Sequence, residues 1–226
     1  MPLFMLDAAD FPPADWAGPE GLLAVGGDLS PRRLLRAYGR GIFPWFSNGE
    51  PILWWSPEPR FVLFPDEIHV PRSLKKILKK NIFRLTFDHA FAEVIAGCAR
   101  PRPDQDGTWI TDEMRQAYQR LFQLGYAHSM EAWHGGKLAG GLYGISLGRC
   151  FFAESMFHSE ANASKVVFFT LTRILQQHGF ILLDCQIHSP HLAEWGARSI
   201  ARCEYLEWLR RGMACTTRRG SWENLL

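Results

Sequence analysis

The alternation of hydrophobic and polar positions is clearest in the second half of the chain. Two alternating stretches flank the turn His134-Gly135-Gly136 and predict a β-hairpin. A third strand-like stretch follows, then a helical segment that stops at Gly179, a further strand and a short helix starting at Ser189-Pro190. The predicted strands cover residues 127–133, 137–145, 149–156 and 180–187, and the long helix covers 160–178. Antiparallel strands followed by helix, strand and helix indicate an α+β fold.

The first 60 residues have a different character. Ser30, Pro31 and Gly39 are placed as the N-cap, first residue and end of a short helix. The stretch that follows, residues 43–60, is rich in proline and alternates turns with short extended pieces. We therefore predict a small N-terminal domain over residues 1–60 and a second domain over 61–226.

Four further elements are predicted between these regions. Residues 71–80 predict a basic helix and residues 82–87 a strand. Asp88 is placed to cap a helix over residues 88–99, and Thr111 is placed to cap another that ends at Gly125.

Composition narrows the class of protein. Of 226 residues, 47% are hydrophobic and 21% charged, and no apolar run approaches the ~20 residues that span a bilayer. The first residues lack a basic segment followed by a long apolar one, so we predict no secretory signal and a cytoplasmic location. The five cysteines are widely spread and predict reduced thiols.

Positive charge is concentrated in one segment of the chain. The formal net charge is only +2, yet the predicted helix at 71–80 places like charges four residues apart. Such crowding is unfavourable unless a polyanion compensates it, so the helix is a candidate nucleic-acid surface, and a solvated surface helix is the alternative. Its basic residues are Arg72, Lys75, Lys76, Lys79 and Lys80.

Three segments carry polar or aromatic side chains that could do chemistry. Asp184 and Gln186 are two residues apart at the end of a buried-looking strand, so they are expected on one face, although they could simply satisfy the following turn. Glu154 interrupts a run of aromatic residues, where burial would be costly unless it meets a cation, either an internal arginine or one brought by a substrate. Trp109 and Tyr118 flank the start of the helix capped by Thr111 and could be either core or ligand contacts.

Other chemistries are poorly supported. Cys185, His188 and His191 have metal-like spacing, but no second ligand cluster completes a zinc site, so no metal is predicted. The sequence has no G-x-S-x-G, G-x-G-x-x-G or G-x-x-x-x-G-K-[ST] motif. No cofactor is predicted.

Seven ordered motifs, spread over nearly the whole chain, resemble those of the bacterial leucyl/phenylalanyl-tRNA protein transferases. They are Gly21-Leu22-Leu23-Ala24-Val25-Gly26-Gly27-Asp28-Leu29-Ser30, Gly41-Ile42-Phe43-Pro44-Trp45-Phe46, Trp54-Trp55-Ser56-Pro57, Gly107-Thr108-Trp109-Ile110-Thr111, Glu154-Ser155-Met156-Phe157, Asn162-Ala163-Ser164-Lys165 and Asp184-Cys185-Gln186.

The resemblance implies a small N-terminal domain and a C-terminal mixed-sheet domain like that of the GNAT acetyltransferases. It further implies transfer of Leu, Phe or Met from aminoacyl-tRNA to proteins that begin with Arg or Lys, which marks them for N-degron proteolysis. By position, the family's donor and catalytic residues fall on Trp45, Trp109, Tyr118, Glu154, Asp184 and Gln186. We expect a monomer.

Two alternatives stay open, an acetyl-CoA-dependent N-acetyltransferase of the same fold and a non-catalytic RNA-binding protein. An acetyl-CoA enzyme needs a glycine-rich helix start for the pyrophosphate. The segment after Phe157 is instead His158-Ser159-Glu160-Ala161-Asn162, which lacks glycine and carries a carboxylate. This difference counts against the acetyl-CoA alternative, and the aminoacyl transfer that the resemblance implies stays the first hypothesis.

Within that reading each candidate receives a role. Gln186 is expected to orient the incoming amine, and Asp184 either to hold Gln186 or to accept the proton. Glu154 is expected at the acceptor's cationic end. Trp45 is expected to stack on the terminal adenosine, and Trp109 and Tyr118 to shape the donor pocket, with Leu171 and Leu175 as further wall residues.

Overall fold

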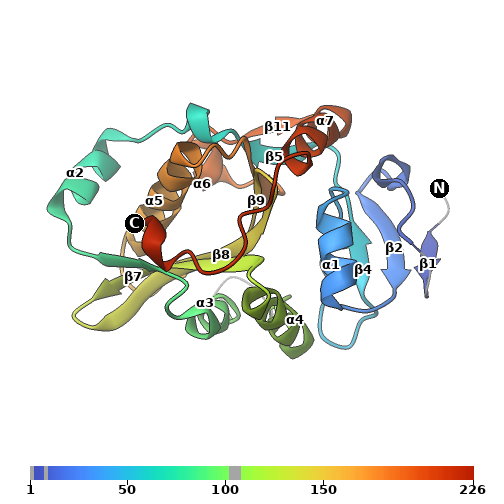
Figure 1. Cartoon of the computed structure of the whole chain (residues 1–226), viewed down its shortest axis with the longest axis horizontal. Coiled ribbons are helices and arrows are strands. Elements are labelled where there is room, and N and C mark those ends of the chain that lie inside the picture. The colour runs from blue at the N-terminus through green and yellow to red at the C-terminus, as the bar shows by residue number, and fades with distance from the viewer. Residues whose placement is uncertain (1–2, 8–9, 102–107) are drawn as a thin grey trace.

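The computed structural model describes residues 3–7, 10–101 and 108–226, which form a mixed α/β protein with two sheets (Figure 1). The first sheet is built from residues before position 56 and has the order β1-β2-β4-β3. Its strands are β1 (Phe4–Leu6), β2 (Leu22–Gly26), β4 (Leu53–Trp55) and β3 (Phe43–Pro44). Helix α1 (Pro31–Tyr38) lies beside this sheet, and a 3-10 turn, η1 (Ala14–Trp16), precedes β2.

The second sheet has seven strands in the order β11-β5-β10-β9-β8-β7-β6. These are β11 (Arg198–Ile200), β5 (Arg60–Leu63), β10 (Leu182–Gln186), β9 (Cys150–His158), β8 (Lys137–Leu147), β7 (Ala127–His134) and β6 (Arg84–Phe87). Strand β10 runs parallel to β9 and antiparallel to β5, and the remaining pairs are antiparallel. The centre of the sheet therefore holds two parallel strands whose carboxyl ends lie side by side.

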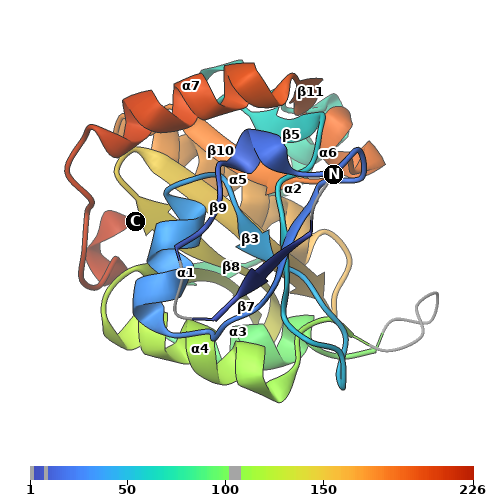
Figure 2. The same ribbon diagram turned by 90° about the vertical axis from the view of Figure 1, so that its right-hand side faces the viewer.

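Helices cover both faces of the second sheet. They are α2 (Arg72–Lys80), α3 (Phe91–Cys98), α4 (Asp112–Gln123), α5 (Ala163–Gln177), α6 (Pro190–Ala193) and α7 (Arg202–Met213), with the short turns η2 (Pro65–Glu67) and η3 (Glu223–Leu225). Figure 2 shows α7 on one side of the molecule and α3 with α4 on the other, with α1 between them.

Alternate strand residues enter two hydrophobic cores, as a pleated strand requires. Val62, Phe152 and Leu182 point into a core shared with α1, α3, α4 and α7, whereas Phe151 and Leu183 point into a core shared with α2, α5 and α6. The first core also includes residues of the first sheet, so both sheets pack around it. Helix α1 is thereby brought against the second sheet.

Several local predictions are confirmed. The Ser30 hydroxyl accepts from the backbone of Arg33 at the start of α1, and the Thr111 hydroxyl accepts from that of Met114 at the start of α4. The hairpin forms as β7 and β8, and the basic helix forms as α2. Helix α5 begins later than predicted, at Ala163, because Asn162 has a left-handed backbone with φ 71°.

The prediction that Asp88 caps a helix is wrong. Helix α3 begins at Phe91, and its N-cap is Ala90. The Asp88 carboxylate instead accepts from the backbone nitrogens of Ser129 and Trp222, at 2.9 and 2.8 Å. The Asp88 carboxylate is therefore hydrogen-bonded to the C-terminal segment and does not cap a helix.

Among the described residues, none of the helices combines the length and the apolar character that crossing a membrane requires.

Candidate active site

The carboxyl ends of β9 and β10 bring two of the predicted residues together. Asp184 pairs with Phe152 in the parallel ladder, and Glu154 and Gln186 lie just beyond this pair. Gln186 Nε2 donates to Glu154 Oε1 at 2.9 Å, and both side chains are 8% exposed. Adjacent parallel strands thus place a carboxyl and a carboxamide in contact near the surface.

Backbone irregularities aim these side chains. The register between β8 and β9 shifts between Tyr143 and Gly144, which leaves Glu154 unpaired in the ladder. The register between β10 and β5 shifts between Asp184 and Gln186, and Gln186 adopts φ 65°. Such bulges redirect side chains and are common beside active sites, and a left-handed glutamine is uncommon. The simple two-residue alternation used to place Gln186 therefore does not describe this strand end.

Two tyrosine hydroxyls complete the surroundings of Glu154. Tyr38 from α1 donates to Oε1 at 2.8 Å, and Tyr118 from α4 donates to Oε2 at 2.9 Å. Burial raises the pKa of Glu154 to about 7, although hydrogen bonds from Tyr38, Tyr118 and Gln186 act in the opposite direction. We call Tyr38, Tyr118, Glu154 and Gln186 the polar cluster.

An internal arginine is one of two cations considered as the partner of Glu154, and the buried arginine of this region pairs with Asp184 instead. Arg60, at the start of β5, donates from Nε and Nη2 to the two carboxylate oxygens of Asp184 at 2.9 and 2.7 Å. Both side chains are buried. In the described part of the chain, the recorded hydrogen-bond partners of Glu154 are two hydroxyls and an amide rather than an arginine. Of the two cations considered for Glu154, the internal arginine is therefore not found among the described residues, because Arg60 pairs with Asp184.

Asp184 has further partners that fix its position. The Tyr205 hydroxyl donates to Oδ2 at 2.8 Å, and the backbone nitrogen of Gln186 donates to Oδ1 at 2.9 Å. The Arg60 guanidinium also donates to the carbonyl of Gly41 and lies over the Phe43 and Tyr205 rings. Asp184 is thus a buried anion whose contacts hold the bulged backbone of Gln186.

The three aromatic candidates differ in how deeply they are buried and in what they contact. Tyr118 is fully buried, and its ring meets that of Tyr143 edge to face at 5.5 Å. Trp109 is half-buried against the same core, while Gly107 of its motif lies outside the described residues. Trp45 is 40% exposed and packs against Trp55.

Leu171 and Leu175 lie on α5 and are buried in the other core, beside residues such as Phe151 and Leu183. That core is on the opposite face of the sheet from the ring of Tyr118. The structure therefore does not bring these two leucines together with the polar cluster.

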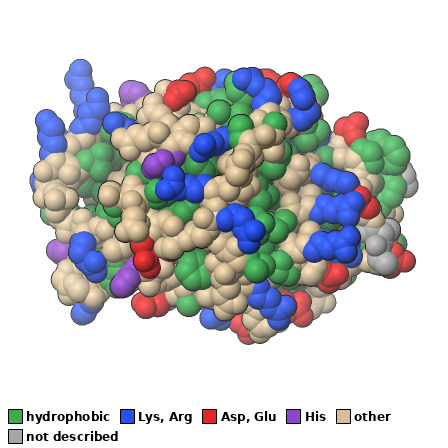
Figure 3. Space-filling model, viewed as in Figure 1, with side chains coloured by type: hydrophobic (Ala, Val, Ile, Leu, Met, Phe, Trp, Pro, Cys, Tyr) green, Lys and Arg blue, Asp and Glu red, His purple; other side chains and the backbone are tan. Residues whose placement is uncertain are grey.

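The basic residues of α2 are exposed. Figure 3 shows Lys and Arg side chains gathered at the end of the molecule that α2 occupies, away from the first sheet. The four lysines and Arg72 form what we call the α2 basic face.

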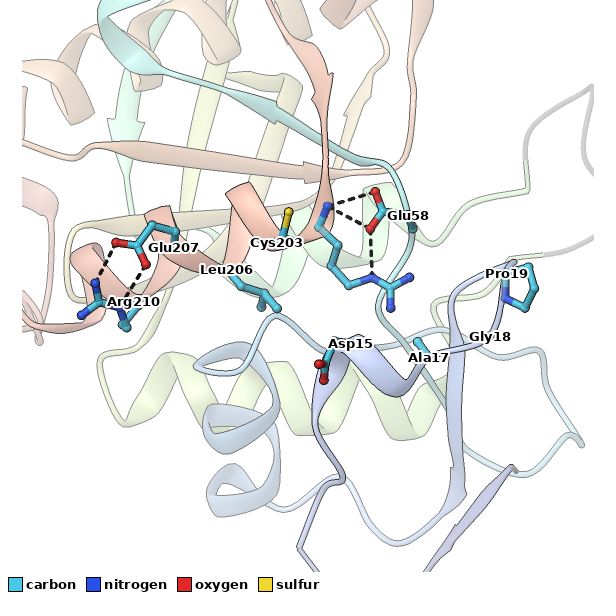
Figure 4. Close-up of a pocket in the computed structure, with 10 residues that line it drawn as sticks. Asp15, Ala17, Gly18, Pro19, Glu58, Cys203, Leu206, Glu207 and Arg210 are labelled. Carbon is cyan, nitrogen blue, oxygen red and sulfur yellow. Dashed lines mark hydrogen bonds and ion pairs between the residues drawn. The ribbon is translucent and has the colours of Figure 1, made fainter. Parts of the chain in front are cut away.

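A separate open groove of about 630 Å³ lies between η1 and α7 (Figure 4). Its charged side chains largely pair with each other. Glu58 accepts from the backbone nitrogen of Arg202 and approaches its guanidinium, and Glu207 accepts from Arg210. Arg202 ties the N-terminal segment to α7 through Glu58 and the carbonyl of Ala14, whereas the Glu207–Arg210 pair lies within α7.

Three residues were missed by sequence reasoning. Tyr38 occupies a core position of α1, and such tyrosines are common. Tyr205 gives no local signal either. Arg60 is the most discoverable, because it directly precedes the apolar strand Phe61-Val62-Leu63-Phe64, where a charge must find a partner.

Comparison with known proteins assigns the chain. The family model for leucyl/phenylalanyl-tRNA protein transferase matches residues 62–210, and the model for its N-terminal domain matches residues 27–58. A leucyl/phenylalanyl-tRNA–protein transferase of Syntrophus aciditrophicus is 56% identical over 94% of this chain and 89% of its own. One from Myxococcus xanthus is 53% identical over 98% of this chain and 97% of its own.

Two of the solved structures that match are remote likenesses. A protein of unknown function from Staphylococcus epidermidis has a TM-score of 0.43 at 10% identity, covering 80% of this chain and 68% of that one. L-PGS from Bacillus licheniformis has a TM-score of 0.41 at 10% identity, covering 76% and 57%. The sequence relatives are far closer, and with two family models matched along its length the chain belongs to the leucyl/phenylalanyl-tRNA protein transferase family.

Proposed function

We propose that this chain transfers Leu, Phe or Met from aminoacyl-tRNA to the α-amino group of proteins that begin with Arg or Lys. Family membership supports the transfer reaction. The observation that carries the site assignment is the contact between Glu154 and Gln186 at the ends of two parallel strands. In this proposal, residues 1–60 form a small domain and residues 61–226 an acetyltransferase-like domain that binds aminoacyl-tRNA in place of acetyl-CoA.

The transfer reaction requires the enzyme to position the two substrates more than to activate them. An aminoacyl ester is already reactive, so amide formation needs a neutral amine, its orientation and stabilisation of the developing oxyanion. A protein α-amino group has a pKa of about 7.7 to 8.0, so a useful neutral fraction exists near neutral pH. Gln186 is too weak a base to take a free proton, and its carboxamide serves to orient the amine by hydrogen bonding.

Asp184 acts as a positioning residue. Both of its oxygens already accept from Arg60, and they also accept from Tyr205 and the backbone of Gln186. These four donors occupy the lone-pair sites of the carboxylate, which leaves no site facing the amine. Of the two roles considered from sequence, holding Gln186 is therefore the one that these contacts support.

Glu154 serves the acceptor's positive charge. Its carboxyl group has donors but no internal cation among its recorded partners. Because its pKa is about 7, the ionised form is populated in the neutral range. An arriving ammonium or guanidinium group would supply the missing positive charge.

The donor is held by aromatic side chains and by charge. Trp109 and Tyr118 shape the pocket for the transferred side chain, and exposed Trp45 stacks on the terminal adenosine. Leu171 and Leu175 lie in the core on the other face of the sheet, so this proposal does not assign them to the pocket. The α2 basic face contacts phosphates of the tRNA body, which suits an enzyme that accepts tRNAs of different sequence.

The test is transfer of labelled Leu from leucyl-tRNA to matched peptides that begin with Arg, Lys, Ala or Glu. We expect wild type to prefer Arg and Lys, and Glu154→Gln to lose this preference more than it loses donor binding. Glu131→Gln is the matched control, because Glu131 is also buried and also accepts from two hydroxyls, those of Thr86 and Ser129, but lies on β7. A variant Glu154→Gln that keeps full selectivity would reject the role of Glu154.

The same assay separates the alternatives. Acetyl transfer from acetyl-CoA to these peptides, with no transfer of Leu, would favour an acetyltransferase. Binding of charged tRNA that stays intact in the presence of every acceptor would favour a non-catalytic RNA-binding protein. Either result would reject the proposed reaction.

A further inference from the structure

Three oxygen-bearing side chains of the polar cluster contact one another in a closed triangle. The Tyr38 hydroxyl lies 2.8 Å from Glu154 Oε1, and the Tyr118 hydroxyl lies 2.9 Å from Oε2. The two hydroxyls lie 2.5 Å apart. The three residues come from α1, α4 and β9, and both tyrosines are completely buried.

The number of protons determines how this triangle can be filled. If Glu154 is ionised, only the two tyrosine protons are available for three oxygen–oxygen contacts. With both hydroxyls donating to the carboxylate, the tyrosine oxygens face each other at 2.5 Å with no proton between them. An ionised Glu154 therefore leaves one close contact between two electron-rich oxygens.

A protonated Glu154 removes this defect. Oε2 then donates to Tyr118, Tyr118 donates to Tyr38, and Tyr38 donates to Oε1. Gln186 Nε2 also donates to Oε1, which is why the proton is assigned to Oε2. Three protons fill three contacts, and each acceptor has a free lone pair for its donor.

We propose that Tyr38 is a positioning residue that closes a three-proton ring with Tyr118 and protonated Glu154 in the free enzyme. Resting on the proposed function, we further assign the opening of this ring to acceptor capture. The acceptor's cation binds the ionised carboxylate, the Oε2 proton passes to solvent, and Tyr118 turns to donate to Oε2. No bond other than this O–H bond is broken.

The surroundings are consistent with a proton held at Glu154. Burial and the nearby Asp184 charge raise the pKa of this carboxyl to about 7, even against the hydrogen bonds that its partners donate, which act to lower it. The buried cation Arg60 is bound by Asp184. The ionisable groups that face the ring or its immediate neighbours are Tyr38 on α1, Arg60 on β5, Cys98 on α3, Tyr118 on α4, Tyr143 on β8, Asp184 on β10 and Tyr205 on α7.

The ring makes a directional prediction about Tyr38. If Tyr38 merely donates to an ionised carboxylate, Tyr38→Phe removes a stabilising donor, and the Glu154 pKa rises. If Tyr38 closes the ring, its removal costs the protonated form two hydrogen bonds, whereas the ionised form loses one donor and is also relieved of the unfavourable oxygen–oxygen contact. The Glu154 pKa then falls, by about 0.5 to 1 for a typical neutral hydrogen bond.

The experiment is a pH titration of side-chain carboxyl ¹³C signals in protein labelled at Glu, with Glu154 identified by its absence in Glu154→Gln. We expect Tyr38→Phe to move the Glu154 midpoint to lower pH. Tyr143→Phe is the matched control, because Tyr143 is an equally buried neighbour of Tyr118 whose hydroxyl has no recorded partner. If Tyr38→Phe does not fold, Tyr118→Phe opens the same ring and carries the same expectation.

A midpoint that rises or stays in place in the ring variants overturns the ring. The measurement uses free enzyme and needs no transfer, so it remains decisive even if the proposed reaction fails. With the same Arg peptide, the acceptor KM of wild type should fall as the pH rises from 6 to 8, and in Tyr38→Phe this fall should occur at lower pH. If the pH dependence of the acceptor KM is the same in Tyr38→Phe as in wild type, opening of the ring is not part of acceptor capture, and that coupling is refuted.

Discussion

Replacing Arg60 with Met tests how the buried ion pair supports both fold and site. The substitution removes two charge-assisted hydrogen bonds to Asp184 and one to the carbonyl of Gly41. Asp184 keeps the donors Tyr205 and Gln186 but loses its positive partner while it is fully buried. Burial alone would lower the pKa of Arg60, yet Asp184 and Tyr205 hold it above its usual range, so the arginine is charged in the native state.

The expected cost follows from leaving that anion unpaired. Removing one partner of a buried pair costs about 3 to 5 kcal/mol. For a protein of this size each kcal/mol shifts Tm by about 2 to 4 °C, so Tm should fall by roughly 6 to 20 °C. The loosened backbone of Gln186 should also lower kcat by about tenfold or more, since small misplacements of an orienting group are expensive.

Calorimetry and single-turnover transfer measure the two effects. The double variant Arg60→Met/Asp184→Leu should recover part of the lost stability, because the unpaired charge is gone, but not the lost rate. Arg202→Met is the matched control. Arg202 is buried too, but its partner Glu58 has a side chain that is 44% exposed and stays hydrated, so a smaller loss is expected. A loss for Arg60→Met of under about 1 kcal/mol, or one no larger than the control's, would refute the reasoning.

Three further predictions concern separate parts of the molecule. Glu154 has an ordinary pKa of 4.5 and a folded-state pKa of about 7, so the folded state keeps its proton to higher pH and stability should decline between these pH values. Glu154→Gln should reduce the decline between pH 5 and 8 by about 2.5 kcal/mol in denaturant titrations, and an unchanged slope would contradict this. Trp222→Ala should lower the free energy of unfolding by about 3 to 5 kcal/mol and leave kcat unchanged, because Trp222 is 1% exposed and packs on His128 and Phe87. A variant with unchanged stability and a reduced kcat would contradict this prediction. Four exposed lysines of α2 are to be replaced together by Gln: Lys75, Lys76, Lys79 and Lys80. This should weaken the binding of every charged tRNA and flatten the salt dependence of that binding, while use of an aminoacyl-adenosine donor stays unchanged. Equal losses on both donors would reject the contact between α2 and the tRNA.

Elements governed by local rules were predictable. The hairpin, the basic helix and the Ser30 and Thr111 caps each depend on residues within a few positions of one another. Asp88 followed the same local rule and failed, because Trp222, 134 residues away in sequence, uses its carboxylate. Local reasoning fails where a distant backbone group competes for the same side chain.

The sequence predicted which residues belong to the candidate site better than it predicted the contacts between them. Glu154 and Gln186 stood out because a polar side chain in an apolar run must be satisfied. Their contact depends on two bulges and a left-handed residue that no alternation pattern reveals. Tyr38 and Arg60 reach the site only through the packing of α1 and β5, so neither could be assigned from its neighbours in the sequence.

The position of β5 between β11 and β10 has a consequence for synthesis of the protein. This strand is made early, yet Arg60 must wait for Asp184, 124 residues later. At about 5 to 20 residues per second the ribosome needs roughly 6 to 25 s to make that stretch. During this time an apolar strand with open edges is present on the nascent chain, which is the kind of segment that recruits chaperones or aggregates. The enzyme should therefore gain activity late and abruptly, once the last strands enter the sheet.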